Sequence, residues 1–312
     1  MEQALYHPEH GYYSSGRAAV GRRGDYFTNV SVGPLFGQLL AAQFAEIWER
    51  LGRIDNFVIV EQGAHDGIFA RDVFEAARER SPEFFDALRY RIVEPFPVWQ
   101  DRQSQTLDGF RDKVDWRDSI ETLDPFAGIH FSNELIDAMP INLRGKSVGL
   151  EGDNLVFVEG PTELRNQAVL DWIDHLSRKL KRGLVIAIDY GFARDEFREV
   201  VQARAQHRHL DSPFEEIGDA DISAHVNWTE IAERAEGNGF RVAGFTDQHH
   251  FLTGIISAWP EFAQDPGTKR ALQTLLHPEM LGRAFQVLAL AKDVDLVAVP
   301  LAGFKYTRGP RL

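Results

Sequence analysis

The strongest constraint on the fold of this chain is a repeated alternation of short apolar segments with longer segments of helical periodicity. Residues 57–60 are wholly apolar, and a glycine-bearing turn leads from them into a helical pattern over 68–80. Further strands are predicted at 90–93, 113–116, 129–132, 184–188, 240–245 and 285–291. Strands that alternate with helices form a parallel sheet covered by helices on both faces. The sequence therefore predicts a doubly wound, mostly parallel α/β fold, with room for one antiparallel edge strand near the end of the chain.

Three segments depart from this alternation. Residues 1–32 are rich in Gly, Tyr and Ser without a sustained period, and we interpret them as an ordered N-terminal lid. Residues 141–160 carry four glycines between short apolar runs, which indicates inserted hairpins. Residues 192–225 have weak periodicity and many charges, so we expect a second insertion, hairpin or helical, near the carboxyl ends of the strands. Residues 1–312 are then expected to form a single domain with these additions.

Composition narrows the classes of partner and compartment. The formal net charge is 34 − 47 = −13, which disfavours a duplex nucleic-acid partner and suits a cationic protein or peptide. The chain has no cysteine, so disulfides and thiolate metal sites are excluded. No apolar stretch approaches the roughly 20 residues that span a bilayer, and the first ten residues contain no Lys or Arg, unlike a signal peptide. We expect a protein that has no membrane segment and lies in the cytoplasm, with its oligomeric state left open.

The end of the first predicted strand has the chemistry of a cofactor site. Glu61 ends the strand, and Gly63 and Gly67 flank a tight turn into the next helix. Ligands of doubly wound sheets bind at this position, where glycines let the backbone approach them closely. The spacing follows the E-x-G-x-G-x-G motif of S-adenosylmethionine methyltransferases, with His65 in place of the middle glycine, rather than the G-x-G-x-x-G of a nicotinamide oxidoreductase. A purely structural turn is the alternative.

Two further acidic positions fit a bound nucleoside. Glu94 ends the second strand, 33 residues after Glu61, where a carboxylate can accept both ribose hydroxyls. Asp118 and Ser119 follow the third strand, where they could contact an adenine amino group. The alternatives are an exposed loop acid at Glu94 and a helix N-cap at Asp118.

A polar cluster follows the fourth strand. Asn133, Glu134 and Asp137 come where the sheet opens, beside any cofactor held at Gly63. Two carboxylates at such a place favour a functional role over a solvated surface. By contrast, His207, His209, His249 and His250 lack the H-E-x-x-H pattern of a zinc site, so we expect no metal.

Several motifs occur in order along nearly the whole chain. They are His7-Pro8, Gly11-Tyr12-Tyr13, Gly24-Asp25-Tyr26-Phe27-Thr28, Phe36-Gly37, Glu61 to Gly67, Val93-Glu94-Pro95, Ser132-Asn133-Glu134, Asp137-Ala138-Met139-Pro140, Asp189-Tyr190-Gly191 and Asp221-Ile222-Ser223-Ala224-His225-Val226-Asn227-Trp228. Together they resemble the MidA-like family, which includes the mitochondrial complex I assembly methyltransferase. The resemblance implies a seven-stranded class I methyltransferase fold (Rossmann-like), S-adenosylmethionine as methyl donor and, by analogy, a protein arginine as acceptor.

The resemblance also distributes roles among residues. From the strand-end chemistry and the resemblance together, we expect cofactor binding by Glu61, Gly63, His65, Gly67, Glu94, Asp118 and Ser119, and substrate binding by Asp25, Thr28, Asp189 and Tyr190. The chain departs from the family pattern at Gln62 and His65, where the family has Leu and Gly, and at Ile217, where it has Pro.

A mechanism follows from the chemistry of methyl transfer. Displacement at a sulfonium depends mainly on positioning, and an arginine acceptor stays protonated, so paired carboxylates can orient its guanidinium. Glu134 and Asp137 are the candidates, with Asn133 shaping the pocket and His225 relaying a proton. His225 could equally serve packing. The alternative function is a catalytically weak protein of the same fold that acts as a partner-binding or assembly module, which Gln62 and His65 motivate.

Overall fold

We analysed a computed structural model of the chain, which describes residues 1–18, 28–162, 166–193, 196, 198, 200–206, 208–294, 296, 299–307 and 312. The helices are α1 Glu2–Tyr6, α2 Leu35–Arg50, α3 Ile68–Arg80, α4 Pro82–Ala87, α5 Pro97–Thr106, α6 Gln167–Lys179, α7 Trp228–Gly237, α8 Gln248–Ala258, α9 Glu261–Gln264 and α10 Lys269–Leu276. The strands are β1 Phe57–Gln62, β2 Leu88–Val93, β3 Val114–Arg117, β4 Phe126–Asn133, β5 Lys146–Glu151, β6 Asn154–Glu159, β7 Leu180–Phe192, β8 Val201–Ala205, β9 Arg208–Leu210, β10 Asp221–Ala224, β11 Val226–Asn227, β12 Arg241–Asp247 and β13 Phe285–Lys292.

The central sheet has the order β12-β13-β7-β4-β1-β2-β3, with the two-residue β11 paired to β7. Strands β7, β4, β1, β2 and β3 run parallel, and β13 runs antiparallel to both of its neighbours. The predicted α/β fold with a mostly parallel sheet is confirmed, and it is consistent with the class I methyltransferase fold.

The sequence allowed one antiparallel strand at an edge of the sheet, but the antiparallel strand of the structure does not lie at the edge. β13 lies between β7 and β12, and β12 forms the edge. The reason is burial: β13 is buried at all but its second and last residues, whereas β12 has one buried residue among seven. An apolar strand gains most when both of its faces are covered, and a partly polar strand tolerates the edge.

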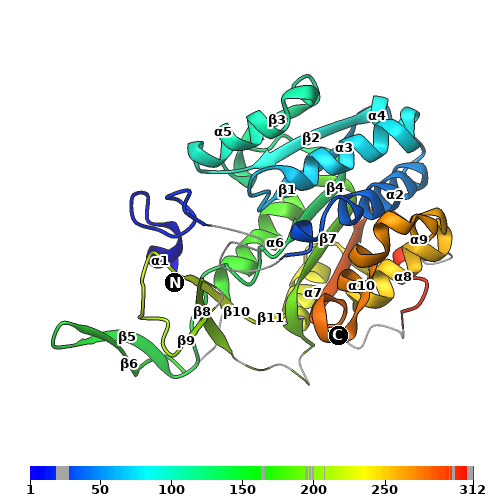
Figure 1. The fold of residues 1–312 in the computed structure, drawn as a ribbon. Coiled ribbons are helices and arrows are strands. Elements are labelled where there is room, and N and C mark those ends of the chain that lie inside the picture. The colour runs from blue at the N-terminus through cyan, green and yellow to red at the C-terminus, as the bar shows by residue number, and fades with distance from the viewer. Residues whose placement is uncertain are drawn as a thin grey trace.

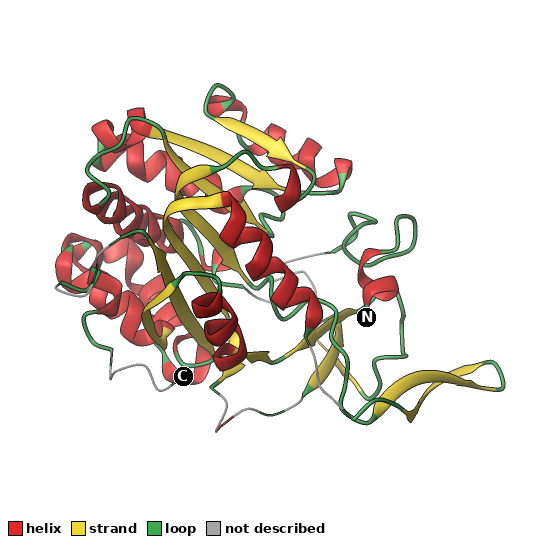
Figure 2. Cartoon of the chain, turned by 180° about the vertical axis from the view of Figure 1, so that it is seen from behind, coloured by secondary structure: helices red, strands yellow, loops and turns green. Residues whose placement is uncertain are grey.

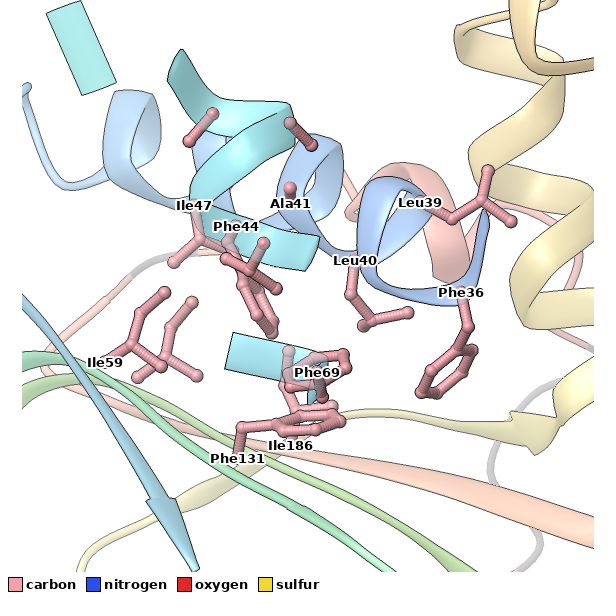
Figure 3. Packing of buried hydrophobic residues seen from close by; sticks show 14 of the residues in the cluster. Phe36, Leu39, Leu40, Ala41, Phe44, Ile47, Ile59, Phe69, Phe131 and Ile186 are labelled. Carbon is pink, nitrogen blue, oxygen red and sulfur yellow. The ribbon is translucent and has the colours of Figure 1, made fainter. Parts of the chain in front are cut away.

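Helices cover both faces of the sheet, as Figures 1 and 2 show from opposite sides. Alternate side chains of β1 divide between the two layers: Phe57 and Ile59 join one core cluster, Val58 and Val60 the other. The first cluster packs beneath α2 and α3, where the ring of Phe69 stacks on that of Phe131 with centroids 4.5 Å apart (Figure 3). The second lies beneath α6 and α7.

The added segments gather toward the carboxyl ends of the parallel strands. Residues 146–159 form the hairpin β5–β6, which projects from the body of the molecule (Figure 1). The described part of residues 192–225 forms a small sheet, β10-β8-β9, and not the helical segment that was one of the expectations. Residues 1–18 pack against α5 and this small sheet through a third apolar cluster that includes Leu5, Tyr12, Trp99 and Ile222.

Membrane-spanning helices and metal-binding clusters are two features that we did not expect from the sequence. No helix in the described ranges has the length and apolarity that crossing a bilayer requires. Within the same ranges, no group of three or more His, Asp or Glu side chains is placed to hold a metal ion.

Candidate active site

The turn after β1 has an unusual backbone that the glycines make possible. Gly63 and Gly67 have φ of 83° and 80°, in the left-handed region that glycine adopts without strain. A Cβ at Gly67 would contact Gln103 on α5 at 3.4 Å, so the turn also packs tightly. This is the geometry expected of a turn that brings its backbone close to a ligand.

His65 adopts the same left-handed conformation without being glycine. Its φ is 47°, and its ring lies against the Trp99 indole with centroids 4.3 Å apart. Its Nε2 lies 3.3 Å from the carbonyl oxygen of Ala18, and its Nδ1 3.6 Å from a carboxylate oxygen of Asp66. These contacts hold the ring where the first motif of the family has only hydrogen, and they link the turn to the N-terminal segment.

Glu61 is buried at the end of β1. One carboxylate oxygen accepts a hydrogen bond of 2.7 Å from the hydroxyl of Tyr90 on β2. Burial raises the pKa of Glu61 to about 8, against the opposing effect of that hydrogen bond. A cationic ligand nearby would therefore favour ionisation of this carboxyl group.

Glu94 is likewise buried, at the end of β2, and its two oxygens are held by different donors. The backbone N–H of Phe96 and the side-chain amide of Gln103 each donate to it at 3.1 Å. Burial raises the pKa of Glu94 to about 7.

Gln103 connects three parts of the site, and sequence reasoning missed it. Its Nε2 also donates to the carbonyl of His65 at 2.8 Å, and its Oε1 accepts from the indole of Trp116 on β3 at 2.9 Å. No local sequence signal marks this residue, because its partners come from three separate strand ends.

Three cavities meet at these strand ends, and Glu134 lines all of them. The first has a volume of about 300 Å³ and a lining of both polar and apolar side chains, with Thr28, Ser31, Glu61, Asp66 and Asn133 as polar members. The second, of about 260 Å³, shares Gly63, His65 and Glu134 with the first and adds an apolar wall of Phe96, Trp99, Leu135 and Met139 beside Glu94. The third, of about 100 Å³, is lined by Tyr13, Glu134, Asp137, Tyr190, Gln202, Arg204, Asp221, Ser223, Ala224 and His225.

The loop after β4 presents Glu134 through a strained backbone and a chain of amides. Glu134 has φ of 54°, and its N–H donates to the carbonyl of Ile188 at 2.9 Å. Its Oε1 accepts 2.9 Å from the amide of Asn133, whose oxygen accepts 2.8 Å from the amide of Asn29. Gln248 on α8 completes the chain by donating to the Asn29 oxygen at 2.8 Å. Sequence reasoning did not identify Asn29 or Gln248.

The carboxylate of Asp189 holds the backbone of this loop through hydrogen bonds. Its Oδ2 accepts from the backbone N–H groups of Ile136 and Asp137 at 2.8 and 3.1 Å, and its Oδ1 accepts from that of Tyr190 at 2.7 Å. It is buried and lines none of the three cavities. Burial raises its pKa to about 7, opposed by the hydrogen bonds from the backbone.

The third cavity concentrates negative charge. Glu134, Asp137 and Asp221 contribute carboxyl groups, with Arg204 as the cationic side chain of its lining. Burial raises the pKa of Glu134 to about 8 and raises the pKa of Asp137 above its ordinary range, and repulsion from Asp189 and Asp221 adds to both shifts. Burial lowers the pKa of His225, which lines the same cavity, so its imidazole favours the neutral form.

Several expected site residues lie elsewhere. Asp118 accepts a hydrogen bond of 3.3 Å from Gln100, and Ser119 caps the short 3₁₀ helix Ile120–Thr122; neither lines the three cavities. Thr28 lines the first cavity and not the third. Asp25 lies outside the described residues.

Comparison with known proteins identifies the chain. The model of the family described as "Putative S-adenosyl-L-methionine-dependent methyltransferase" matches residues 39–158 and 154–246. The chain belongs to this methyltransferase family. The resemblance to MidA-like proteins drawn from the sequence motifs is thereby confirmed.

Solved structures agree with the family. A crystal structure of a Burkholderia thailandensis protein, described as a "likely methyl transferase" and bound to S-adenosyl-homocysteine, has a TM-score of 0.83 and 27% identity. The match covers 98% of this chain and 89% of that one. A second Burkholderia thailandensis structure, without ligand in its description, has a TM-score of 0.82 and 25% identity over 98% and 88% of the two chains.

Curated relatives carry more specific names. The "Protein arginine methyltransferase NDUFAF7 homolog, mitochondrial" of Drosophila melanogaster is 23% identical over 97% of this chain and 84% of its own. The human "Protein arginine methyltransferase NDUFAF7, mitochondrial" is 22% identical over 100% of this chain and 82% of its own. The expectation of a cytoplasmic location is contradicted by these names, which place the relatives in mitochondria. That expectation rested on the lack of a long apolar stretch and on the composition of the first ten residues, and neither feature reports the compartment.

The methyltransferase is S-adenosylmethionine-dependent, and its own residues fit that cofactor. In the turn after β1, Gly63 and Gly67 expose backbone without a side chain, and the buried Glu94 lies on the wall of an adjacent, largely apolar cavity. The first two cavities adjoin each other, and their combined volume lies in the range typical of small-molecule sites.

Proposed function

We propose that this methyltransferase transfers the methyl group to the side chain of an arginine in a protein. The observation that carries the proposal is the small third cavity, which is lined by several carboxyl groups. It shares Glu134 with the first and second cavities, which together we call the cofactor cleft. Its volume of about 100 Å³ suits a planar guanidinium and excludes a large acceptor group. The names of the curated relatives and the negative net charge of this chain add support.

The cofactor's two ends differ in polarity, and so do the two larger cavities. Glu94 in the second cavity would accept the ribose hydroxyls of a bound cofactor, beside the apolar Phe96, Leu135 and Met139. The first cavity, with the polar Asn133 and Thr28, would hold the amino-acid end. Glu134 lines both of these cavities and the third, so it would lie between the cofactor and the acceptor.

The acceptor is oriented by carboxylates. Bound S-adenosylmethionine supplies a methyl group on a sulfonium, whose S–C bond breaks as the acceptor nitrogen forms its bond to carbon. Glu134 and Asp137 accept hydrogen bonds from the guanidinium and direct one nitrogen toward the methyl group. The nitrogen releases a proton, which a carboxylate or the neutral His225 can take. Asp189 accepts a hydrogen bond from the backbone N–H of Asp137. Asp189 therefore acts as a positioning residue for Asp137.

Glu134→Gln tests this function. Incubation with radiolabelled S-adenosylmethionine and a lysate should label arginine side chains with the native protein. Methyl incorporation by the variant should be at least about 100-fold lower, because the carboxylate charge that orients the guanidinium is absent. Its affinity for S-adenosylhomocysteine in calorimetry should change less than about threefold.

Glu121→Gln is the matched control, because Glu121 is exposed and lines none of the three cavities. It should retain full incorporation. Label found on another residue type, or full activity of Glu134→Gln, would contradict an arginine acceptor bound by Glu134.

His65 favours a second candidate function, a partner-binding or assembly module with weak catalysis. Its imidazole lines both cofactor cavities at a position where the family motif has glycine, so it reduces the space for the donor. Calorimetry with millimolar S-adenosylmethionine distinguishes the two: absence of binding would leave only the module.

A further inference from the structure

We infer that Asp221, held by the hydroxyl of Tyr13, is a third carboxylate that binds the acceptor's guanidinium, and that Tyr13 is its positioning residue. The inference deepens the proposed function and rests on it. It concerns a wall of the third cavity that comes from the small sheet and the N-terminal segment rather than from the central sheet.

The contact joins residues that are distant in sequence. The hydroxyl of Tyr13 donates to Oδ1 of Asp221 at 2.7 Å, across 208 residues. Asp221 begins β10 and is only 8% exposed, yet it lines the third cavity together with Glu134 and Asp137. Its carboxylate therefore adds hydrogen-bond acceptors to those of Glu134 and Asp137 in the same cavity, and a guanidinium has N–H donors for more than two of them.

Arg204 is the cationic side chain in the lining of this cavity. It lies opposite Asp221 in the register of β8 and β10, and its guanidinium donates to the side-chain oxygen of Gln202 at 3.0 Å. Repulsion from Asp221 raises the pKa values of both Glu134 and Asp137, which shows that the three carboxyl groups share one electrostatic environment.

Tyr13 is placed to set the direction of Asp221. Its ring lines both the second and the third cavities, and its carbonyl oxygen accepts 2.7 Å from the Trp99 indole. Trp99 in turn packs on His65 of the cofactor turn. Tyr13 therefore forms part of the wall between the second cavity and the third.

The alternative is that this hydrogen bond only attaches the N-terminal segment to β10. A second contact makes the two roles separable: Arg17 pairs with Asp219 at 3.0 Å, on the exposed surface of the same loop. Asp219→Asn weakens the attachment without touching the cavity, so it is the matched control for Asp221→Asn.

The test measures binding of a tripeptide, acetylated and amidated Gly-Arg-Gly, to the protein saturated with S-adenosylhomocysteine. The citrulline tripeptide is its neutral counterpart. The native protein should bind the arginine form at least about tenfold more tightly than the citrulline form. Asp221→Asn should reduce that ratio by about tenfold, and Tyr13→Phe by about threefold, with the affinity for S-adenosylhomocysteine unchanged. Tyr13→Phe should have no effect in the Asp221→Asn background, because positioning acts through the carboxylate.

Each other result overturns a defined statement. A native protein that binds both tripeptides equally would overturn the arginine acceptor and this inference with it. Native discrimination that persists in Asp221→Asn would overturn the inference alone. An equal loss in Asp219→Asn and Asp221→Asn, or equal weakening of both tripeptides, would show attachment instead of recognition. An undiminished effect of Tyr13→Phe in the Asp221→Asn background would remove Tyr13 as a positioning residue.

Discussion

At the scale of single residues, two side chains of the site occupy backbone conformations that disfavour them. His65 and Glu134 have φ of 47° and 54°, and both line the cofactor cleft. A left-handed conformation costs a residue other than glycine about 1–2 kcal/mol, and such strain concentrates at functional sites. For Glu134, the strained turn aims the carboxylate at the junction of the three cavities.

The strain at His65 can be measured with a pair of variants. His65→Ala and His65→Gly both lose the contact with Trp99, so their difference isolates the backbone. We expect His65→Gly to be more stable than His65→Ala by about 1 kcal/mol in urea unfolding. Equal stabilities, or a more stable His65→Ala, would mean that residue 65 relaxes out of the left-handed region once the ring is removed.

The raised pKa of Glu134 predicts a pH profile. Below about pH 8 the carboxyl group of the ligand-free protein is largely protonated and cannot pair with a guanidinium. Activity expressed as kcat/KM should therefore rise as pH increases from 6 to about 8, with a slope near tenfold per pH unit on the acidic side. The kcat profile should shift to lower pH, because a bound sulfonium favours the carboxylate. Methyl incorporation across pH 6 to 9 measures both, and a flat kcat/KM profile would contradict a role for ionised Glu134.

At the scale of elements, the centre of the sheet depends on a pair of facing glycines. Gly128 on β4 and Gly183 on β7 are register partners with φ of 141° and 139°. A Cβ on Gly183 would collide with the carbonyl oxygen of Gly128, and a Cβ on Gly128 with that of Val58 on β1. A side chain at Gly128 would thus force apart β4 and β1, which lead to Glu134 and Glu61, and a side chain at Gly183 would force apart β7 and β4.

Gly183→Ala should destabilise the protein by about 3 kcal/mol or more, because neither the backbone conformation nor the space accommodates a methyl group. Gly109→Ala is the control, since nothing lies within 4 Å of a Cβ at Gly109. Urea unfolding of the two variants measures the difference. A loss at Gly183 no larger than that at Gly109 would show that the strands shift freely.

At the scale of the whole molecule, the cofactor cleft joins parts that are far apart in sequence. Tyr6 of α1, Glu94 after β2 and Met139 after β4 line the same cavity, and the hydroxyl of Tyr6 donates to the carbonyl of Ala138 at 2.9 Å. A ligand that contacts all of these parts stabilises their arrangement as a unit.

S-adenosylhomocysteine at about one hundred times its Kd should therefore stabilise the protein by about 2.7 kcal/mol and raise Tm by a few degrees. Differential scanning calorimetry measures the shift. Adenosine at the same concentration, which lacks the amino-acid end, should give a smaller shift. An equal shift with adenosine would place no part of the ligand in the first cavity.

Patterns along the chain were enough to predict the order of strands and helices and the acidic residues at the strand ends. The helix predicted over 68–80 occurs at Ile68–Arg80, and Glu61, Glu94 and Glu134 lie at strand ends beside shared cavities. These features are local: hydrophobic period, glycine turns and strand termini are written in neighbouring residues.

The contacts between polar groups, in contrast, could be assigned only from the three-dimensional structure. It placed β13 inside the sheet, paired Tyr13 with Asp221, turned Asp189 toward backbone N–H groups and left Asp118 beside Gln100. Such contacts depend on the direction of single side chains in loops and on packing between segments up to 208 residues apart. A pattern along the chain carries no information on either, because both are set by the core on which the loops rest.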